Sequence, residues 1–543
     1  MIKNKKNETF LIISALALAI ALKIALVAGQ FVPFNSDEAV VALMARHILQ
    51  GERPIFFYGQ AYMGSLDAWL IAASFWLFGE HVWVIRLVQG LLYGGTLLTT
   101  VKLGALALGD RRIGVVAAWL LAIPTVTVTL YTTASLGGYG ECLLMGNLIL
   151  ILGLIIGRDL REHGQAKWIY LLFWGILAGG GLWVFGLTLV YSLPTGLYLL
   201  WKYWHLSRRS LPGAGAWIFL GGIIGAAPWW IFGLQHGISY LFVELGGGGI
   251  ADVEQGTWIS QVGMHLLSLI LFGGTATFGL RPSWELRWLA LPLLPFILAF
   301  WLGVLVYLFK RMRRGQLNRE GASLLLGVLL TLTIGFVFTP FGADPSGRYF
   351  VPLAIPLSLF AAELILRLGS RKPLWGWGLA ALLVAFNLWG TVQSAVKFPP
   401  GITTQFDPVA QIDHRYMNEL IAFLQEHGES RGYTNYWVAY PLAFHSSETL
   451  IYTPRLPYHE DFRYTERDDR YAPYDAAVAL AQRVAYITTN HPALNDRLRQ
   501  GFATLGVTWQ EQQIGDYHVF YQLSRPVYPW EIGLGENCCG AIE

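Results

Sequence analysis

Apolar runs of about 20 residues recur between residues 10 and 392, and they limit the possible folds of this chain more than any other feature. A run of that length crosses roughly 30 Å of hydrocarbon as an α-helix. Inside a bilayer only helices and closed barrels satisfy every backbone hydrogen bond. The composition agrees, since 54% of the 543 residues are hydrophobic and 13% are charged. These features predict a polytopic, all-α membrane protein.

The positions of lysine and arginine give the expected topology. Short basic clusters between apolar runs face the cytoplasm in membrane proteins. Residues 10–28 are therefore expected to form a retained signal-anchor helix that leads out of the cytoplasm. With every basic cluster on one side, the chain is predicted to cross the membrane about eleven times.

Two apolar stretches break this one-sided pattern if they cross the membrane. They are residues 66–78 and residues 259–278. We expect both to lie at, or dip into, the outer membrane interface.

The composition changes near Pro399, after the last predicted span. Residues 1–398 are expected to form the membrane domain, and residues 399–543 a small, soluble α/β domain on the extracytoplasmic side. Within this second domain, a helix is predicted over residues 412–426 and strands over residues 436–440, 484–488 and 518–522. The net charge of +3 is too small to indicate a nucleic acid partner.

The first outer loop carries two adjacent carboxylates, Asp37 and Glu38, just before an amphipathic stretch. An acid at this position can take a proton from a hydroxyl group or bind a metal ion. A second interpretation is that Ser36, Asp37 and Glu38 cap and charge the N-terminus of the following helix.

A late arginine, Arg348, lies at a predicted span end on the same side as Asp37. An arginine there can neutralise the phosphate that leaves a lipid-linked donor. Alternatively, Arg348 snorkels to the interface or pairs with Asp344. The other residues predicted on this side are Gln60, Tyr62, Arg86, Glu141, Glu244, Asp252, Asp344 and Tyr349.

Together these residues resemble the GT-C superfamily of polyprenyl-phosphate-sugar-dependent membrane glycosyltransferases, of the protein O-mannosyltransferase and aminoarabinose-transferase type. The resemblance rests on four separate segments between residues 30 and 360. They are residues 37–51, residues 58–66, Arg86-Leu87, and the Arg-Tyr-Phe-Val-Pro run at residues 348–352 with Pro356.

The resemblance implies a GT-C type fold and an inverting transfer of a sugar to an acceptor hydroxyl on the outer face of the cytoplasmic membrane. It implies that Asp37 is the general base and that Glu38 orients the acceptor or helps to bind a cation. The donor phosphate is expected to contact Arg348, Tyr349 and Arg86. The other substrate contacts are expected from Gln60, Tyr62 and Glu141.

The resemblance also implies the partners. They are a polyprenyl-phosphate-linked sugar, membrane lipids, and an acceptor hydroxyl on a glycan, a lipid or a protein. A divalent cation is an open possibility, and its ligands other than Glu38 are left open.

A transporter or flippase of a lipid-linked sugar is the alternative function. Secondary transporters place polar residues near the bilayer midplane, in broken helices of two repeated halves. Here the acids and Arg348 lie at predicted span ends, and no repeated halves are visible. This placement favours the enzyme.

Overall fold

The computed structural model describes residues 5–247, 256–315, 319–397 and 399–534. The chain divides into two compact units. The first unit comprises Met1–Gly29, Ala61–Asp67 and Trp83–Ser394. The second comprises Gln30–Gln60, Ala68–Val82 and Ala395–Glu543. The second unit thus combines two segments from the N-terminal part of the chain with the C-terminal segment.

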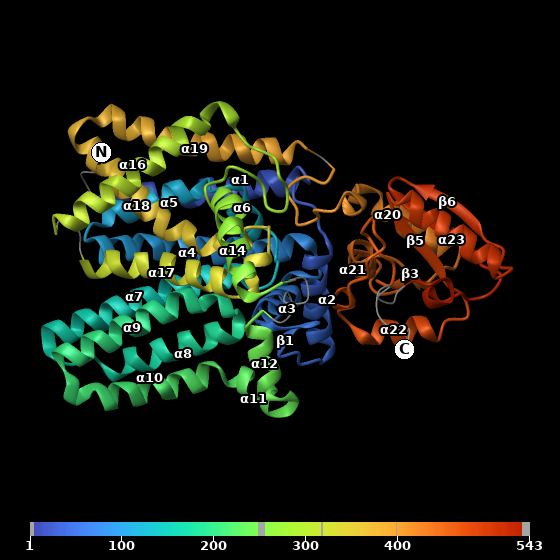
Figure 1. The fold of residues 1–543 in the computed structure, drawn as a ribbon, viewed down its shortest axis with the longest axis horizontal. Coiled ribbons are helices and arrows are strands. Elements are labelled where there is room, and N and C mark those ends of the chain that lie inside the picture. Colours follow the sequence, from blue (N-terminus) through green and yellow to red (C-terminus); the bar gives the residue numbers. More distant parts are fainter. Residues whose placement is uncertain (1–4, 248–255, 316–318, 398, 535–543) are drawn as a thin grey trace. The chain divides into compact units, whose positions relative to one another are not determined.

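The first unit is built almost entirely of helices (Figure 1). Its main helices are α1 (Lys5–Ala28), α4 (Val82–Leu108), α5 (Arg111–Ala122), α6 (Val126–Tyr131), α7 (Tyr139–His163), α8 (Trp168–Val184), α9 (Leu189–Leu206), α10 (Leu211–Gly225), α11 (Ala227–His236), α12 (Ile238–Leu245), α14 (Trp258–Ser268), α15 (Thr275–Thr277), α16 (Leu294–Arg313), α17 (Arg319–Phe338), α18 (Ala354–Arg371) and α19 (Pro373–Ala395). Short helical turns include η1 (Gly186–Thr188), η3 (Leu269–Gly274), η5 (Pro340–Ala343) and η6 (Arg348–Leu353).

Among the described residues, eight helices are long and apolar enough to cross a membrane, or nine if the bent pair α10 and α11 forms one span. The polytopic helical fold class is therefore confirmed, but the number is lower than the expected eleven. One reason is that the apolar run at residues 113–133, one of the runs expected to cross, is divided between α5 and α6. A second is that α8 is a shorter apolar helix of 17 residues.

The two apolar stretches that were expected at the interface differ from each other. Trp258–Thr277, which covers α14, η3 and α15, is long and apolar enough to cross. Leu66–Phe78 (α3) is only a shorter apolar helix of 13 residues. Length and composition thus favour a membrane span for Trp258–Thr277 and not for Leu66–Phe78.

Close helix packing in the first unit depends on glycine. Figure 1 shows α7, α8, α9 and α10 running alongside one another, and α8 packs directly on α10. A Cβ atom at Gly221 of α10 would lie 2.2 Å from the carbonyl oxygen of Leu172 on α8. Small residues let membrane helices approach this closely.

The second unit contains a five-stranded mixed sheet with helices (Figure 1). Its strands, in the order β4-β3-β5-β7-β6, are β4 (Ile451–Thr453), β3 (Arg431–Tyr433), β5 (Ala485–Thr489), β7 (Tyr517–Tyr521) and β6 (Gln510–Ile514). Pairing is parallel from β4 through β3 to β5 and antiparallel from β5 through β7 to β6. The helices are α2 (Ser36–Gln50), α20 (Met417–Glu426), α21 (Tyr436–His445), α22 (Ala472–Ala479) and α23 (Pro492–Thr504). The short strands β1 (Phe56–Phe57) and β2 (Gln60–Gly64) lie between α2 and α3 in the sequence.

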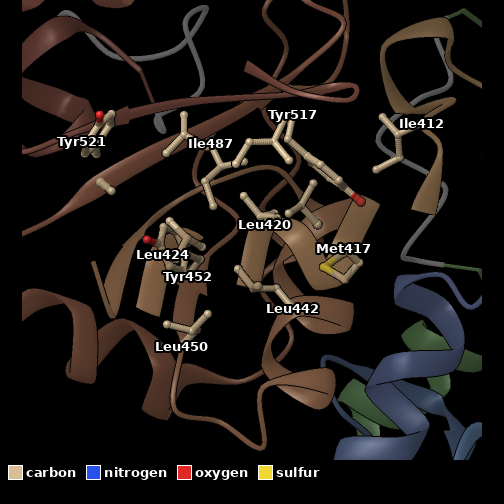
Figure 2. Packing of buried hydrophobic residues seen from close by; sticks show 14 residues of the cluster. Ile412, Met417, Leu420, Leu424, Leu442, Leu450, Tyr452, Ile487, Tyr517 and Tyr521 are labelled. Carbon is tan, nitrogen blue, oxygen red and sulfur yellow. The ribbon is translucent and has the colours of Figure 1, made fainter. Parts of the chain in front are cut away.

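An apolar cluster joins the sheet to α20 and α21 (Figure 2). Leu420 and Leu424 of α20 pack with Leu442 of α21 and Ile487 of β5, all fully buried. Burying such side chains contributes roughly 1.5–3 kcal/mol each. The cluster therefore holds the helices on the sheet.

The predicted secondary structure of the C-terminal segment is right in three places and wrong in one. The helix is found as α20, and two strands are found as β5 and β7. Residues 436–440, predicted as a strand, begin helix α21 instead. Asn435 caps this helix by accepting a hydrogen bond from the backbone N–H of Trp437 at 3.0 Å. A short apolar run that is buried on all sides has no periodicity that separates helix from strand.

Candidate functional site

The N-terminus of α2 presents Asp37 and keeps Glu38 inside. Asn35 caps the helix, because its side chain accepts a hydrogen bond from the backbone N–H of Glu38 at 3.4 Å. Asp37 and Glu38 both lie in the first turn, where a negative charge interacts favourably with the helix dipole. Asp37 is half-buried, whereas Glu38 is fully buried.

The carboxylate of Asp37 is held on both oxygens by the C-terminal segment, within the second unit. Its Oδ1 accepts a hydrogen bond from the Tyr436 hydroxyl at 2.7 Å. Its Oδ2 accepts one from the Thr404 hydroxyl at 2.6 Å. Burial, together with the nearby Asp37 carboxylate, raises the pKa of Tyr436, so the phenol remains a donor. Two donors from one segment therefore orient Asp37.

Gln60 and Arg470 lie next to this arrangement in the second unit. With the amide oxygen of Gln60 facing Arg470, that oxygen accepts two hydrogen bonds from the guanidinium, at 2.7 and 2.9 Å. The guanidinium also lies over the Tyr436 ring, 5.5 Å from its centroid. Gln60 thus positions a cation beside the tyrosine that holds Asp37.

A second carboxyl group, Asp468, interacts electrostatically with Asp37. Burial raises the pKa of Asp468 to about 7, and Arg470 and a hydrogen bond from Tyr458 oppose that rise. Near neutral pH this group therefore exchanges a proton, which makes the charge around Asp37 dependent on pH.

In the first unit, Arg348 begins η6 and is surrounded by aromatic rings. Its Nη2 forms an ion pair with Asp344 Oδ2 at 2.7 Å and donates to the Tyr349 hydroxyl at 3.1 Å. The guanidinium also faces the ring of Trp284, 5.2 Å from its centroid. The Nε atom of Arg348 is buried and makes no hydrogen bond with any residue that the structure describes. The pairing with Asp344 that the sequence left open is present, and one donor remains for a ligand.

The backbone before Arg348 requires glycine. Gly347 has φ +78°, in the left-handed region, and a Cβ atom there would lie 2.3 Å from the Cβ of Ala276. Arg281 holds the same loop by donating a hydrogen bond to the carbonyl of Pro345. Both features fix the direction in which η6 begins.

An apolar cavity of about 280 Å³ lies beside Arg348, within the first unit. Tyr349, Tyr62 and Phe341 are in its wall, and apolar side chains of α9 and α17 form much of the rest. Tyr62 also interacts electrostatically with Arg348. The cavity therefore combines an apolar interior with a cationic group next to one part of its wall.

A buried carboxyl pair, Asp67 and Glu141, forms a separate group in the first unit. Asp67 Oδ1 accepts a hydrogen bond from the Gln89 side chain at 2.9 Å, and its Oδ2 accepts one from the Ser135 hydroxyl. Glu141, in the first turn of α7, interacts electrostatically with Asp67. Both acids are almost completely buried, at 3% and 2% exposure. Glu141 therefore has a polar neighbour that the sequence analysis missed.

Arg86 lies on α4 and is buried. It interacts electrostatically with Lys23 of α1, whose ammonium donates to the hydroxyls of Thr132 and Thr133 at 2.8 and 3.0 Å.

The predicted site residues thus fall into distinct groups. Asp37, Glu38 and Gln60 belong to the second unit. In the first unit, Tyr62 and Tyr349 line the cavity, and Arg348 donates a hydrogen bond to the Tyr349 hydroxyl. Glu141 lies beside Asp67, and Arg86 lies near Lys23. Asp252 lies outside the described residues.

Sequence reasoning missed Tyr436, Thr404 and Arg470 because no local pattern links them to residues more than 360 positions away. Asp67 carried a usable signal, since an acid inside an apolar run is costly and marks a special environment. Among the residues that the structure describes, no group of three or more His, Cys, Asp or Glu side chains could hold a metal ion.

No known protein family profile and no curated protein sequence matches this chain. Solved structures do resemble it. ArnT from Cupriavidus metallidurans bound to undecaprenyl phosphate aligns with a TM-score of 0.55 and 12% identity, over 93% of this chain and 97% of that one. The oligosaccharyltransferase of Archaeoglobus fulgidus in the apo form aligns with a TM-score of 0.54 and 13% identity, over 90% of this chain and 70% of that one. The archaeal oligosaccharyltransferase AglB from Archaeoglobus fulgidus, in complex with an inhibitory peptide and a dolichol-phosphate, aligns with a TM-score of 0.51 and 13% identity, over 88% of this chain and 69% of that one.

The chain has the GT-C fold. The alignment runs through both units, so the C-terminal segment is part of the shared architecture. At 12–13% identity the likeness shows the fold and leaves the roles of individual side chains to be argued from their contacts.

Proposed function

We propose that this GT-C protein is a membrane glycosyltransferase that moves a sugar from a polyprenyl-phosphate donor to an acceptor hydroxyl. The observation that carries this proposal is the apolar cavity beside Arg348, whose wall includes Tyr349. A polyprenyl-phosphate sugar needs an apolar space for its chain and a cation for its phosphate, and the first unit has both.

Arg348 is the residue proposed to bind the donor phosphate. Guanidinium and phosphate form strong, directional hydrogen bonds. Asp344 and Tyr349 hold one end of the guanidinium, which leaves the buried Nε as a donor. Tyr62, on the cavity wall, is proposed to contact the donor near this phosphate. Neutralising the phosphate makes it a better leaving group.

Asp37 is proposed to be the general base. Tyr436 and Thr404 orient its carboxylate and leave further lone pairs that can accept a proton. In the proposed step the acceptor hydroxyl gives its proton to Asp37 while its oxygen bonds to the anomeric carbon. The bond between that carbon and the phosphate oxygen breaks, and the polyprenyl phosphate leaves with the electron pair. A single displacement inverts the anomeric configuration.

The donor class fits what the structural relatives are recorded with, since ArnT was solved with undecaprenyl phosphate and AglB with a dolichol-phosphate. The proposed acceptor is a hydroxyl on a glycan, a lipid or a protein. The transfer is proposed to occur on the extracytoplasmic face. The last turn of α18 carries Arg371, and basic residues at the end of a span favour the cytoplasmic side. Arg348 precedes the opposite end of α18, so it is assigned to the extracytoplasmic side.

The test uses the full-length protein in lipid nanodiscs with a panel of undecaprenyl-phosphate sugars, and it measures release of undecaprenyl phosphate. Wild type is expected to turn over at least one donor. Asp37→Asn is expected to lose roughly 100-fold or more in turnover and to keep its affinity for undecaprenyl phosphate. Arg348→Gln is expected to lose roughly tenfold or more in that affinity. Asp496→Asn, at an exposed aspartate on α23, is the matched control.

The result that would overturn the enzyme is donor binding without release, combined with movement of the lipid-linked sugar between the leaflets of liposomes. That outcome would establish the transporter instead. Equal turnover by wild type and Asp37→Asn would remove Asp37 as the base and leave the reaction class intact.

A further inference from the structure

A polar pocket lies near the end of α18 that is farther from Arg348. It has a volume of about 410 Å³, within the range of roughly 300–1,000 Å³ that is typical of ligand sites. The turn between α4 and α5, together with residues of α16 and α18, forms it, all within the first unit. α18 alone has 18 residues, or a length of roughly 27 Å. The pocket is therefore separate from the cavity beside Arg348.

Three arginines and two acids line this pocket: Arg112, Arg311, Arg367, Asp110 and Glu363. Arg112 is paired with Asp110, with Nη2 2.7 Å from Oδ2. Arg311 forms an ion pair with Glu363 and donates to the Tyr307 hydroxyl at 3.1 Å. The pocket thus carries one more positive than negative charge.

Two groups in the pocket remain available to a ligand. Arg367 is exposed, and its guanidinium makes no hydrogen bond within the described part of the chain. The Oε2 atom of Glu363 is buried and also lacks a hydrogen-bond partner there, while the whole side chain is only 7% exposed. A buried carboxylate oxygen without a donor costs free energy, which a ligand hydroxyl would recover.

The surroundings point to a lipid. The last turns of α16 and α18 add Lys310, Arg313 and Arg371, which favour a negatively charged membrane surface. On α16, Leu305 and Phe309 are large apolar side chains that are more than half exposed, as expected of a surface facing acyl chains. Basic pockets between membrane helices bind anionic head groups.

We propose that this pocket binds an anionic phospholipid whose head group carries a free hydroxyl, such as phosphatidylglycerol. The phosphate accepts hydrogen bonds from Arg367, and the head-group hydroxyl donates to Glu363 Oε2. Phosphatidylcholine and phosphatidylethanolamine carry no net negative charge, so they are expected to bind less tightly. The site is independent of the glycosyl transfer proposed above, since neither Asp37 nor Arg348 lines this pocket.

The test measures lipid binding to the full-length protein by native mass spectrometry, with phosphatidylglycerol, phosphatidylethanolamine and phosphatidylcholine of equal chain length. Wild type is expected to bind phosphatidylglycerol most tightly. Arg367→Gln is expected to weaken that binding roughly tenfold, because a charge-assisted hydrogen bond is lost. Arg209→Gln, at an exposed arginine outside the pocket, is the matched control and is expected to bind like wild type.

Equal phosphatidylglycerol binding by wild type and Arg367→Gln would overturn the proposal, and so would equal binding of the three lipids. Competition with soluble glycerol phosphate distinguishes a site for a lipid head group from a site for a free phosphate compound. If it displaces the bound lipid, recognition of the head group is supported. If it binds while phosphatidylglycerol does not, the lipid assignment is wrong. Unchanged melting temperatures of the two variants would show that both remain folded.

Discussion

At the scale of single residues, the main finding is that Asp37 is oriented by side chains distant in the sequence. Tyr436 and Thr404 each donate one hydrogen bond to its carboxylate. Neither residue touches a reacting atom in the proposed reaction, so both are positioning residues. Their effect is exerted through the direction of the Asp37 lone pairs.

Tyr436→Phe tests this positioning. The change removes the donor to Asp37 and keeps the ring that faces Arg470. Turnover is expected to fall roughly 10-fold to 100-fold, while the affinity for undecaprenyl phosphate is unchanged. The matched control is Tyr517→Phe, since the Tyr517 hydroxyl is buried and has no hydrogen-bond partner in the described part of the chain. If both variants keep full turnover, Tyr436 has no positioning role.

Asp468 gives a prediction about pH and stability. Its folded-state pKa is raised to about 7 by burial, whereas an unfolded aspartate titrates near 3.9. The folded state therefore binds the extra proton, and stability is lost as the pH rises from about 4 through about 7. In thermal unfolding, Asp468→Asn is expected to reduce the loss of melting temperature between pH 5 and pH 8. An identical pH dependence in wild type and variant would contradict this assignment.

At the scale of elements, the contact between α8 and α10 depends on individual glycines. A Cβ atom at Gly221 would lie 2.2 Å from a carbonyl oxygen of α8, whereas at Gly222 nothing lies within 4 Å. These adjacent positions form a natural pair for comparison.

Gly221→Ala is expected to destabilise the protein by about 1–3 kcal/mol, because the helices must move apart. Gly222→Ala is expected to be neutral or slightly stabilising, since alanine favours the helix. Thermal unfolding in nanodiscs measures both. Equal melting temperatures for the two variants would show that α8 and α10 are not in tight contact.

At the scale of the whole molecule, the second unit combines two N-terminal segments, Gln30–Gln60 and Ala68–Val82, with the C-terminal segment. Helix α2 depends on this combination. Arg46 donates to the carbonyl of Phe444 at 3.1 Å, and His47 Nε2 lies 2.9 Å from Glu448 Oε1. Nearly all residues of α2 are buried. The C-terminal segment thus supports the helix that carries Asp37.

Truncation after Ser394 tests this dependence. The shortened chain lacks α21 and Glu448, so α2 is expected to lose protection, and turnover is expected to disappear. Hydrogen exchange of the peptide covering residues 36–50, compared with α7 as an internal control, measures the first effect. Retained turnover with unchanged protection would show that the C-terminal segment is dispensable.

Features that depend on local composition follow from the amino-acid sequence alone. Apolar runs predict membrane helices because each helix satisfies its own backbone hydrogen bonds. Arg348 and Tyr349 are adjacent in the chain, so their proximity also follows from the sequence. The remaining features are visible only in the folded protein. The tertiary structure showed α21 where a strand was expected, paired Glu141 with Asp67, and brought Tyr436 and Thr404 to Asp37. These contacts join residues far apart in the chain, and their identity depends on how helices and strands pack, which no short-range pattern contains.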